Sequence, residues 1–210
     1  MRAATGGPQE GVAAGKRALR RDLLSRRARL AEDAAREAAA ALTRRALALP
    51  ELADAGTVAA YVPVGREPGA RALLDALRER GTRVLLPVLL PDDDLDWAPY
   101  GGAGHLRAAG RGLWEPDGER LGPDAVTEAG TVLLPGLAVD VTGLRLGRGG
   151  GSYDRVLARL AAFGAHPALV VLLYDHELLT SVPAEPHDRP VHAAVTPSGV
   201  TRFPAGRPAG

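Results

Sequence analysis

The sequence predicts a single α/β domain with a mostly parallel sheet that is covered by helices on both faces. The first observation is the continuous apolar run 168–174, which is typical of a parallel strand buried on both sides. The second is a strand–helix–strand pattern over residues 57–86, and the third is a strand, glycine loop and helix over residues 131–163. A chain of 210 residues with 46% hydrophobic content can bury the core that this fold needs.

The ordered domain is expected to cover residues 16–197. Residues 1–15 and 198–210 show no hydrophobic period, so we expect both to be disordered tails. From Lys16 onward, apolar residues spaced mostly by four predict a long helix that can break near Glu32 and that ends at Pro50.

The start of this helix is strongly basic. Seven of the fourteen residues 16–29 are Lys or Arg, against one acid. A solvated helix face, an arm that binds nucleic acid and a ligand-binding surface all fit this composition. Lys16 is the one lysine among 26 basic residues, and it lies four positions before Arg20. The two therefore share a helix face and could hold one polyphosphate together.

The strand–helix–strand pattern consists of a strand over 57–62, a helix over about 70–80 that ends at Gly81, and a strand over 84–86. Ligands bind beyond the carboxyl ends of strands in sheets of this kind. Glu67 follows the first of these strands, so it is a candidate site residue as well as a candidate solvated acid. Further on, Trp97 and Tyr100 predict a short strand, and residues 123–129 predict a short helical turn.

Three adjacent acids, Asp92, Asp93 and Asp94, stand in a loop. Successive side chains diverge, so we interpret these acids as a solvated turn and not as a metal site.

The glycine loop before residue 152 has the composition of a phosphate cradle. Five glycines lie between residues 143 and 151, interleaved with Arg145 and Arg148. Glycines can adopt positive φ, so that successive N–H groups point inward, and the helix that starts near Ser152 adds its positive end. The loop contains neither Gly-Lys-Ser/Thr nor G-x-G-x-x-G, so a flexible connector is the alternative.

Composition limits the function classes. A net charge of +1 gives no general attraction to nucleic acid or to anionic membranes. The absence of cysteine excludes disulfides, zinc–thiolate sites and a cysteine nucleophile. The N-terminus shows no signal-peptide pattern, and no apolar run approaches the ~18 residues of a membrane span, so we expect a cytoplasmic protein without a membrane partner.

The glycine loop lies within a longer stretch, residues 135–155, that reads P-G-L-A-V-D-V-T-G-L-R-L-G-R-G-G-G-S-Y-D-R. This stretch closely resembles the signature of the 5-formyltetrahydrofolate cyclo-ligase family, also called methenyltetrahydrofolate synthetase. The family usually has Phe at Val139, Tyr at Ser152 and Asp at His192. Further matches are K-R-A-L-R over 16–20, L-W-E-P over 113–116 and His187-Asp188, so that the resemblance covers residues 16–197.

The resemblance implies a three-layer α/β/α, Rossmann-like fold. It also implies an ATP-dependent conversion of 5-formyltetrahydrofolate to 5,10-methenyltetrahydrofolate with release of ADP and phosphate. The implied partners are a reduced folate and ATP, and we expect a monomer without a nucleic-acid partner. Two alternatives remain open: a folate or nucleotide binder with impaired turnover, indicated by Ser152 and His192, and an RNA-associated protein that uses the basic helix.

The resemblance also assigns roles to residues. Charge for phosphoryl transfer is assigned to Lys16, Arg145 and Arg148. The folate is assigned to Val62, Glu67, Trp114 and Tyr153, and Mg²⁺ to Asp154 and Asp188. ATP is assigned to a larger set: Lys16, Arg17, Arg20, Arg145, Gly147, Arg148, Gly149, Gly150, Gly151, Ser152 and Tyr153.

Overall fold

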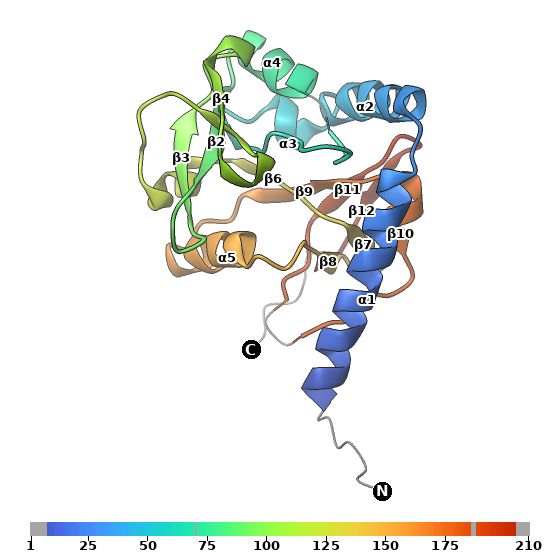
Figure 1. Ribbon diagram of the computed structural model, residues 1–210. Coiled ribbons are helices and arrows are strands. Elements are labelled where there is room, and N and C mark those ends of the chain that lie inside the picture. The colour runs from blue at the N-terminus through green and yellow to red at the C-terminus, as the bar shows by residue number, and fades with distance from the viewer. Residues whose placement is uncertain (1–7, 70, 186–187, 205–210) are drawn as a thin grey trace, which may run out of the picture.

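The computed structural model describes residues 8–69, 71–185 and 188–204. A seven-stranded sheet forms its middle layer, with α2, α3 and α4 on one face and α5 on the other (Figure 1). This arrangement confirms the three-layer, mostly parallel α/β fold.

The α-helices are α1 (Pro8–Ala28), α2 (Glu32–Ala46), α3 (Pro50–Ala53), α4 (Arg71–Glu79) and α5 (Ser152–Ala162). The 3₁₀ turns are η1 (Ala103–His105), η2 (Gly110–Gly112), η3 (Pro123–Glu128) and η4 (Asp175–Glu177). The strands are β1 (Thr57–Ala59), β2 (Arg83–Leu89), β3 (Leu95–Pro99), β4 (Leu106–Ala108), β5 (Trp114–Pro116), β6 (Thr131–Leu134), β7 (Ala138–Asp140), β8 (Arg145–Leu146), β9 (Ala168–Leu172), β10 (Leu178–Leu179), β11 (Ala193–Val195) and β12 (Val200–Arg202). No helix of the described residues is long and apolar enough to cross a membrane.

The strand order of the main sheet is β12-β11-β9-β6-β1-β2-β3. The five strands from β11 to β2 pair in parallel, and the edge strands β12 and β3 pair antiparallel. Strands β1 and β2 are parallel neighbours joined by α4, as the strand–helix–strand pattern predicted. Two smaller sheets, β10-β7-β8 and β4-β5, lie outside the main sheet.

The interior strands are buried on both faces because successive side chains point to opposite sides. In β6, Leu133 joins the core beneath α2 and α4, whereas Val132 and Leu134 join the core beneath α5. In β9, Val170 and Val171 divide between the same two cores. This alternation explains why the run 168–174 is apolar throughout.

The first helix differs from the prediction. It begins at Pro8 and not at Lys16, and its first turns extend past the rest of the molecule (Figure 1). The chain does break before Glu32, but α2 already ends at Ala46. Pro50 lies at the start of helix α3 and not at the end of the predicted long helix. Proline is tolerated at the first position of a helix because that position needs no N–H donor.

Two other boundaries differ, and one hairpin was not predicted. Strand β1 ends at Ala59, three residues before the predicted end, and strand β12 lies within the expected C-terminal tail. Residues 1–7 and 205–210, also expected to be tails, lie outside the described residues. The stretch between β6 and α5 was expected to be a loop but contains the β7–β8 hairpin.

The acids at 92–94 were predicted to form a solvated turn, but two of them form ion pairs. Asp94 is half-buried and pairs with Arg159 of α5 at 2.7 Å, and Asp93 pairs with Arg111 at 2.6 Å. These ion pairs connect the β2–β3 turn to α5 and to the β4–β5 hairpin.

Asp140 ties the β7–β8 hairpin together from a nearly buried position. One carboxylate oxygen accepts hydrogen bonds from the Thr142 hydroxyl (2.6 Å) and from the N–H groups of Thr142 and Leu144, and the other accepts from the Val182 N–H (3.1 Å). Burial alone would raise the pKa of this carboxyl, but these hydrogen bonds outweigh it and lower the pKa below its ordinary 3.8. The Asp140 carboxylate therefore stabilises the hairpin that precedes the glycine loop.

Asp140→Asn is expected to lower the free energy of unfolding by about 1–3 kcal/mol at neutral pH, because the amide has only one acceptor oxygen and its NH2 group replaces the other, so that a buried N–H donor such as that of Val182 loses its acceptor. The pKa is lower in the folded state, so this advantage of the wild type is present above the unfolded-state pKa and is lost as the pH falls through the folded-state pKa. Urea unfolding from neutral to acid pH measures the difference. The exposed Asp54→Asn is the control, and a loss that is equal at every pH would contradict the assignment.

Candidate functional site

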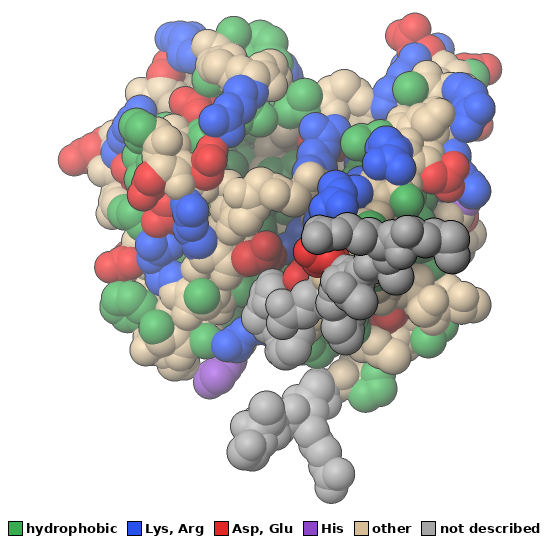
Figure 2. Space-filling view, turned by 60° about the horizontal axis from the view of Figure 1, so that its bottom comes forward, with side chains coloured by type: hydrophobic (Ala, Val, Ile, Leu, Met, Phe, Trp, Pro, Cys, Tyr) green, Lys and Arg blue, Asp and Glu red, His purple; other side chains and the backbone are tan. Residues whose placement is uncertain are grey.

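A cavity of about 620 Å³ lies beyond the carboxyl ends of β1 and β6. Small-molecule sites commonly measure roughly 300–1,000 Å³, so a ligand fits here. Its walls come from α1, the loop after β1, the β4–β5 hairpin, the glycine loop and the segment that includes Glu185 and Asp188. Lys and Arg side chains gather in the middle of the face shown in Figure 2, beside a small group of acidic ones.

The structure brings nearly all the residues predicted for the site into this cavity. Those that line it are Lys16, Arg20, Val62, Glu67, Trp114, Arg145, Gly147, Arg148, Gly149, Gly150, Gly151, Ser152, Tyr153, Asp154 and Asp188. Arg17 instead lines an adjoining cavity of about 520 Å³, which shares Arg20 and Arg148 with the first. Segments from both ends of the chain thus meet at one place.

The glycine loop has the backbone geometry that the sequence predicted. Gly149 and Gly151 have φ values of 94° and 78°, which residues with a Cβ rarely adopt. A Cβ at Gly147 would lie 2.6 Å from an Arg145 nitrogen, so a larger residue there would displace the Arg145 side chain. Gly151 precedes α5 without a side-chain cap, and the first N–H groups of the helix can therefore bind an anion.

Arg145 holds a buried positive charge beside this loop. Its side chain is 8% exposed, and its guanidinium donates to the Pro135 carbonyl (2.9 Å) and pairs with Asp154 (3.1 Å). Burial lowers the pKa of Arg145 and the charge of Asp154 opposes that shift, but a guanidinium stays protonated in proteins. Arg145 can therefore neutralise an anion with little screening by water.

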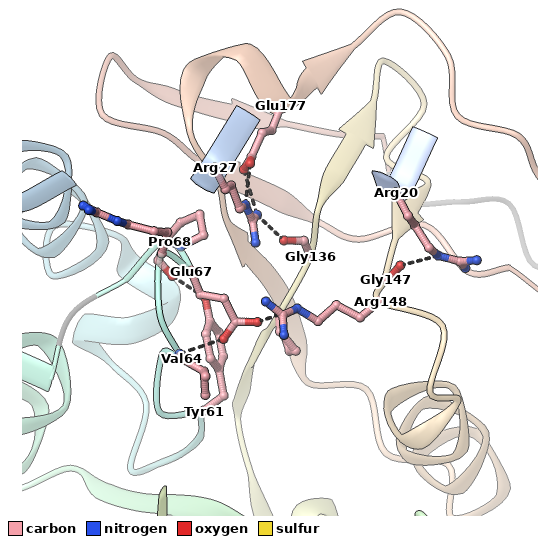
Figure 3. A network of polar contacts seen from close by, with 12 residues as sticks. Arg20, Arg27, Tyr61, Val64, Glu67, Pro68, Gly136, Gly147, Arg148 and Glu177 are labelled. Carbon is pink, nitrogen blue, oxygen red and sulfur yellow. Dashed lines mark hydrogen bonds and ion pairs between the residues drawn. The ribbon is translucent and has the colours of Figure 1, made fainter. Parts of the chain in front are cut away.

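Helix α1 contributes two bases to the cavity. The Lys16 ammonium lies 2.6 Å from a Glu185 oxygen and 2.7 Å from an Asp188 oxygen. Burial by itself would lower the pKa of Lys16, but the hydrogen bonds to Asp188 and Glu185 outweigh it and raise the pKa. Arg20 donates from Nε to the Gly147 carbonyl at 2.9 Å (Figure 3). The helix therefore contacts the glycine loop directly.

An ion pair joins the loop after β1 to the glycine loop. Glu67 accepts a hydrogen bond from the Val64 N–H at 2.9 Å and pairs with Arg148 Nε at 3.1 Å (Figure 3). The Glu67 side chain is only 9% exposed, whereas the Arg148 side chain is 52% exposed. A residue assigned to folate is thus paired with a residue assigned to ATP.

Aromatic side chains provide the other part of the wall. Trp114 is 39% exposed, and the Arg71 guanidinium lies 4.5 Å from the centre of its ring. The Tyr61 hydroxyl donates to the Pro68 carbonyl at 2.7 Å, whereas the buried Tyr153 hydroxyl has no hydrogen-bond partner among the described residues. Burial raises the pKa of both phenols, with a further contribution from the Glu67 charge, so both stay neutral.

The two acids predicted to bind Mg²⁺ are each paired with a base. Asp154 pairs with Arg145, and Asp188 with Lys16. Among the described residues, no group of three or more His, Asp or Glu side chains could hold a metal ion. His192 has a structural partner, because its Nδ1 accepts the Leu169 N–H at 2.8 Å. His187 lies outside the described residues.

Several residues of the site were not predicted from the sequence. Glu185 holds Lys16, and Tyr61 lines the cavity beside Val62. Glu185 stands three residues before Asp188 in the closing motif, which was a usable signal.

The fold and the cavity define an α/β protein with a glycine loop, of a geometry suited to anions, beside an aromatic pocket. The sequence pattern of the 5-formyltetrahydrofolate cyclo-ligase family matches residues 12–197. The chain therefore belongs to this family, which confirms the prediction made from residues 135–155.

Individual relatives agree with this membership. A 5-formyltetrahydrofolate cyclo-ligase of Mycolicibacterium smegmatis is 48% identical over 146 residues, which are 67% of this chain and 73% of that protein. One of Escherichia coli K12 is 32% identical over 158 residues, which are 74% of this chain and 86% of that protein. The NMR structure of Aquifex aeolicus 5,10-methenyltetrahydrofolate synthetase has a TM-score of 0.76 at 28% identity and covers 93% of this chain and 96% of its own.

Two tyrosine variants should shift stability in opposite directions. Tyr153→Phe removes a buried hydroxyl that has no partner, so the free energy of unfolding should stay unchanged or rise. Tyr61→Phe leaves the Pro68 carbonyl unpaired and should lower it by about 1–3 kcal/mol. Urea unfolding of the unliganded protein measures both, and a marked loss for Tyr153→Phe would show that its hydroxyl does have a partner.

Proposed function

We propose that this cavity carries out the ATP-dependent conversion of 5-formyltetrahydrofolate to 5,10-methenyltetrahydrofolate, the activity that gives the family its names, with ADP and phosphate as the other products. The observation that carries this proposal is the composition of the cavity. A glycine loop with buried Arg145 forms one side, and Glu67 with aromatic rings forms another. Phosphate and a flat heterocycle would therefore lie next to each other.

The proposed reaction has two steps. The formyl oxygen of the folate attacks the γ-phosphorus of ATP, ADP leaves, and an imidate phosphate forms. The N10 nitrogen then attacks the activated formyl carbon, phosphate leaves, and the N10 proton is lost. Phosphoryl transfer depends mainly on positioning and charge neutralisation, and we assign these tasks to Arg145, Arg148 and Lys16.

The two substrates would occupy different walls. The phosphates of ATP would lie on the glycine loop and the first turn of α5, with Arg17 and Arg20 extending the site into the adjoining cavity. The folate would contact Val62, Trp114 and Tyr153, and Glu67 would accept hydrogen bonds from ring N–H groups. These assignments rest on placement and on the family resemblance.

Mg²⁺ fits the site only in part. This ion commonly takes one or two carboxylates and fills its other positions with water and phosphate oxygens. Asp154 is suited to this, because its side chain is 58% exposed and faces the cavity. Asp188 is less suited, since it already contacts Lys16 and the Glu185 N–H. The ion would offset phosphate charge during transfer. A monomeric state, a cytoplasmic location and the lack of a nucleic-acid partner stay predictions.

The direct test is the absorbance of the methenyl product, followed with and without ATP. We expect product to form only when 5-formyltetrahydrofolate, ATP and Mg²⁺ are all present. Calorimetric titration of each substrate accompanies the assay. Binding of both substrates without ATP-dependent product would instead identify a binder with impaired turnover.

Asp154→Asn is expected to reduce turnover and to shift the Mg²⁺ midpoint upward, while the melting temperature stays nearly unchanged. The substitution removes the charge but keeps the size of the side chain and an oxygen that can accept from Arg145. Arg145 also keeps the Pro135 carbonyl as a partner, so the loss of the exposed charge should cost little stability. Asp33→Asn is the matched control, because Asp33 is also exposed in the first turn of a helix but lies outside the cavity. Full activity at an unshifted Mg²⁺ midpoint would show that Asp154 is not a ligand.

A further inference from the structure

We infer that Arg27 and Glu177 are positioning residues for the phosphate site: their buried ion pair fixes helix α1 along and around its axis, and so places Lys16 and Arg20 at the glycine loop. This inference rests on the proposed role of Lys16 and Arg20 in binding ATP. Neither Arg27 nor Glu177 lines the cavity, so both act through the helix.

The ion pair has two well-defined contacts and almost no exposure. Arg27 Nε lies 2.6 Å from Glu177 Oε1 and Arg27 Nη2 lies 2.9 Å from Glu177 Oε2, with side chains 4% and 0% exposed (Figure 3). Glu177 also accepts the Tyr174 N–H at 3.0 Å. A bidentate arginine–carboxylate pair fixes both distance and orientation.

Arg27 lies on the same stripe of α1 as the two bases of the cavity. Lys16, Arg20, Leu23 and Arg27 follow one another at intervals of four, three and four, which places them on one helix face. At 1.5 Å per residue, Arg27 lies about 10 Å along the axis from Arg20 and about 16 Å from Lys16. Any shift or rotation at Arg27 is therefore transmitted to both bases.

Arg27 also contacts the turn that positions Arg145. Its Nη2 donates to the Gly136 carbonyl at 2.6 Å, and Arg145 donates to the preceding carbonyl, that of Pro135, at 2.9 Å. The turn after β6 is thus held by one arginine from α1 and one from the glycine-loop hairpin. The turn therefore contacts both parts of the phosphate site, helix α1 and the glycine-loop hairpin.

The apolar contacts of α1 would not fix its position equally well. Leu23 packs against Leu137, Leu146 and Val182, but hydrophobic burial is not directional.

The ion pair between Arg27 and Glu177 is a weak source of stability, because apolar residues of similar volume often replace a buried pair at little cost. Arg27 Nη1 is moreover buried without a partner among the described residues, which itself costs stability. Geometry is therefore the main contribution of this pair.

The test replaces both partners together, since a single substitution would leave a buried charge unpaired. In Arg27→Met with Glu177→Leu, the melting temperature should fall, because the Tyr174 N–H and the Gly136 carbonyl lose their partners, but folate affinity should change less than twofold. ATP affinity should fall about tenfold or more, because small misplacements of binding groups are costly. The matched control on the same helix is Arg26→Gln with Asp22→Asn, which removes an exposed ion pair and should change none of these values.

A second readout measures the helix itself and does not depend on ATP. The chain has no cysteine, so Ala18→Cys and Phe163→Cys allow spin labels at exposed sites on α1 and just after α5. The distribution of distances between the two labels should broaden or shift in the Arg27/Glu177 double variant. It should stay unchanged in the Arg26/Asp22 control. An unchanged distance distribution or an unchanged ATP affinity would overturn the inference. An equal loss of affinity for ATP and for folate would overturn it as well, because the variant would then have disturbed the whole cavity. If the wild type bound no ATP, the proposed function would fail while the distance measurement still tested the helix.

Discussion

The rest of the structure depends on the burial of parallel strands on both faces. Parallel neighbours require long crossovers, and the helices in these crossovers cover the sheet from both sides. The loops that leave β1 and β6 then open at the same edge. Glu67 and Arg145 lie far apart in the sequence but reach one cavity, because each follows one of these strands.

Charges within this cavity are balanced by the protein itself. Lys16 contacts Glu185 and Asp188, Arg145 contacts Asp154, and Arg148 contacts Glu67. A buried charge without a partner would cost several kcal/mol, on the order of the whole stability of a domain. The same pairs keep the bases in place between ligands, so the cavity is formed before a ligand arrives.

The sequence predicted the glycine loop and the strands β1, β2, β3, β6 and β9 of the main sheet, because their signals are local. Positive φ at Gly149 and Gly151 and the alternating burial of β9 both follow from residue type and spacing. The prediction from the sequence was wrong where a contact with a distant part of the chain determines the structure. Pro50 reads equally well as the end of one helix or the start of another, and only the packed chain selects the second.

The partners of the site were the least predictable part. Arg27 resembles Arg26 and Arg29 in the sequence, and only its burial against Glu177 distinguishes it. The same holds for the pairing of Lys16 with Glu185, which are 169 residues apart. Residues that line the cavity were found through the glycine-loop signature and the other segments that resemble the family, whereas residues that hold the cavity in place carry no comparable signature.

The Glu67–Arg148 ion pair has a consequence for the order of events during binding. On the proposed assignment, a folate that takes Glu67 as its acceptor releases Arg148, and a phosphate that takes Arg148 releases Glu67. The first ligand must break the pair, whereas the second finds its binding group already free. Because coupling between two sites is reciprocal, each ligand then raises the affinity of the cavity for the other. The cavity would thus tend to bind ATP and folate at the same time, and would seldom be occupied by one of them alone.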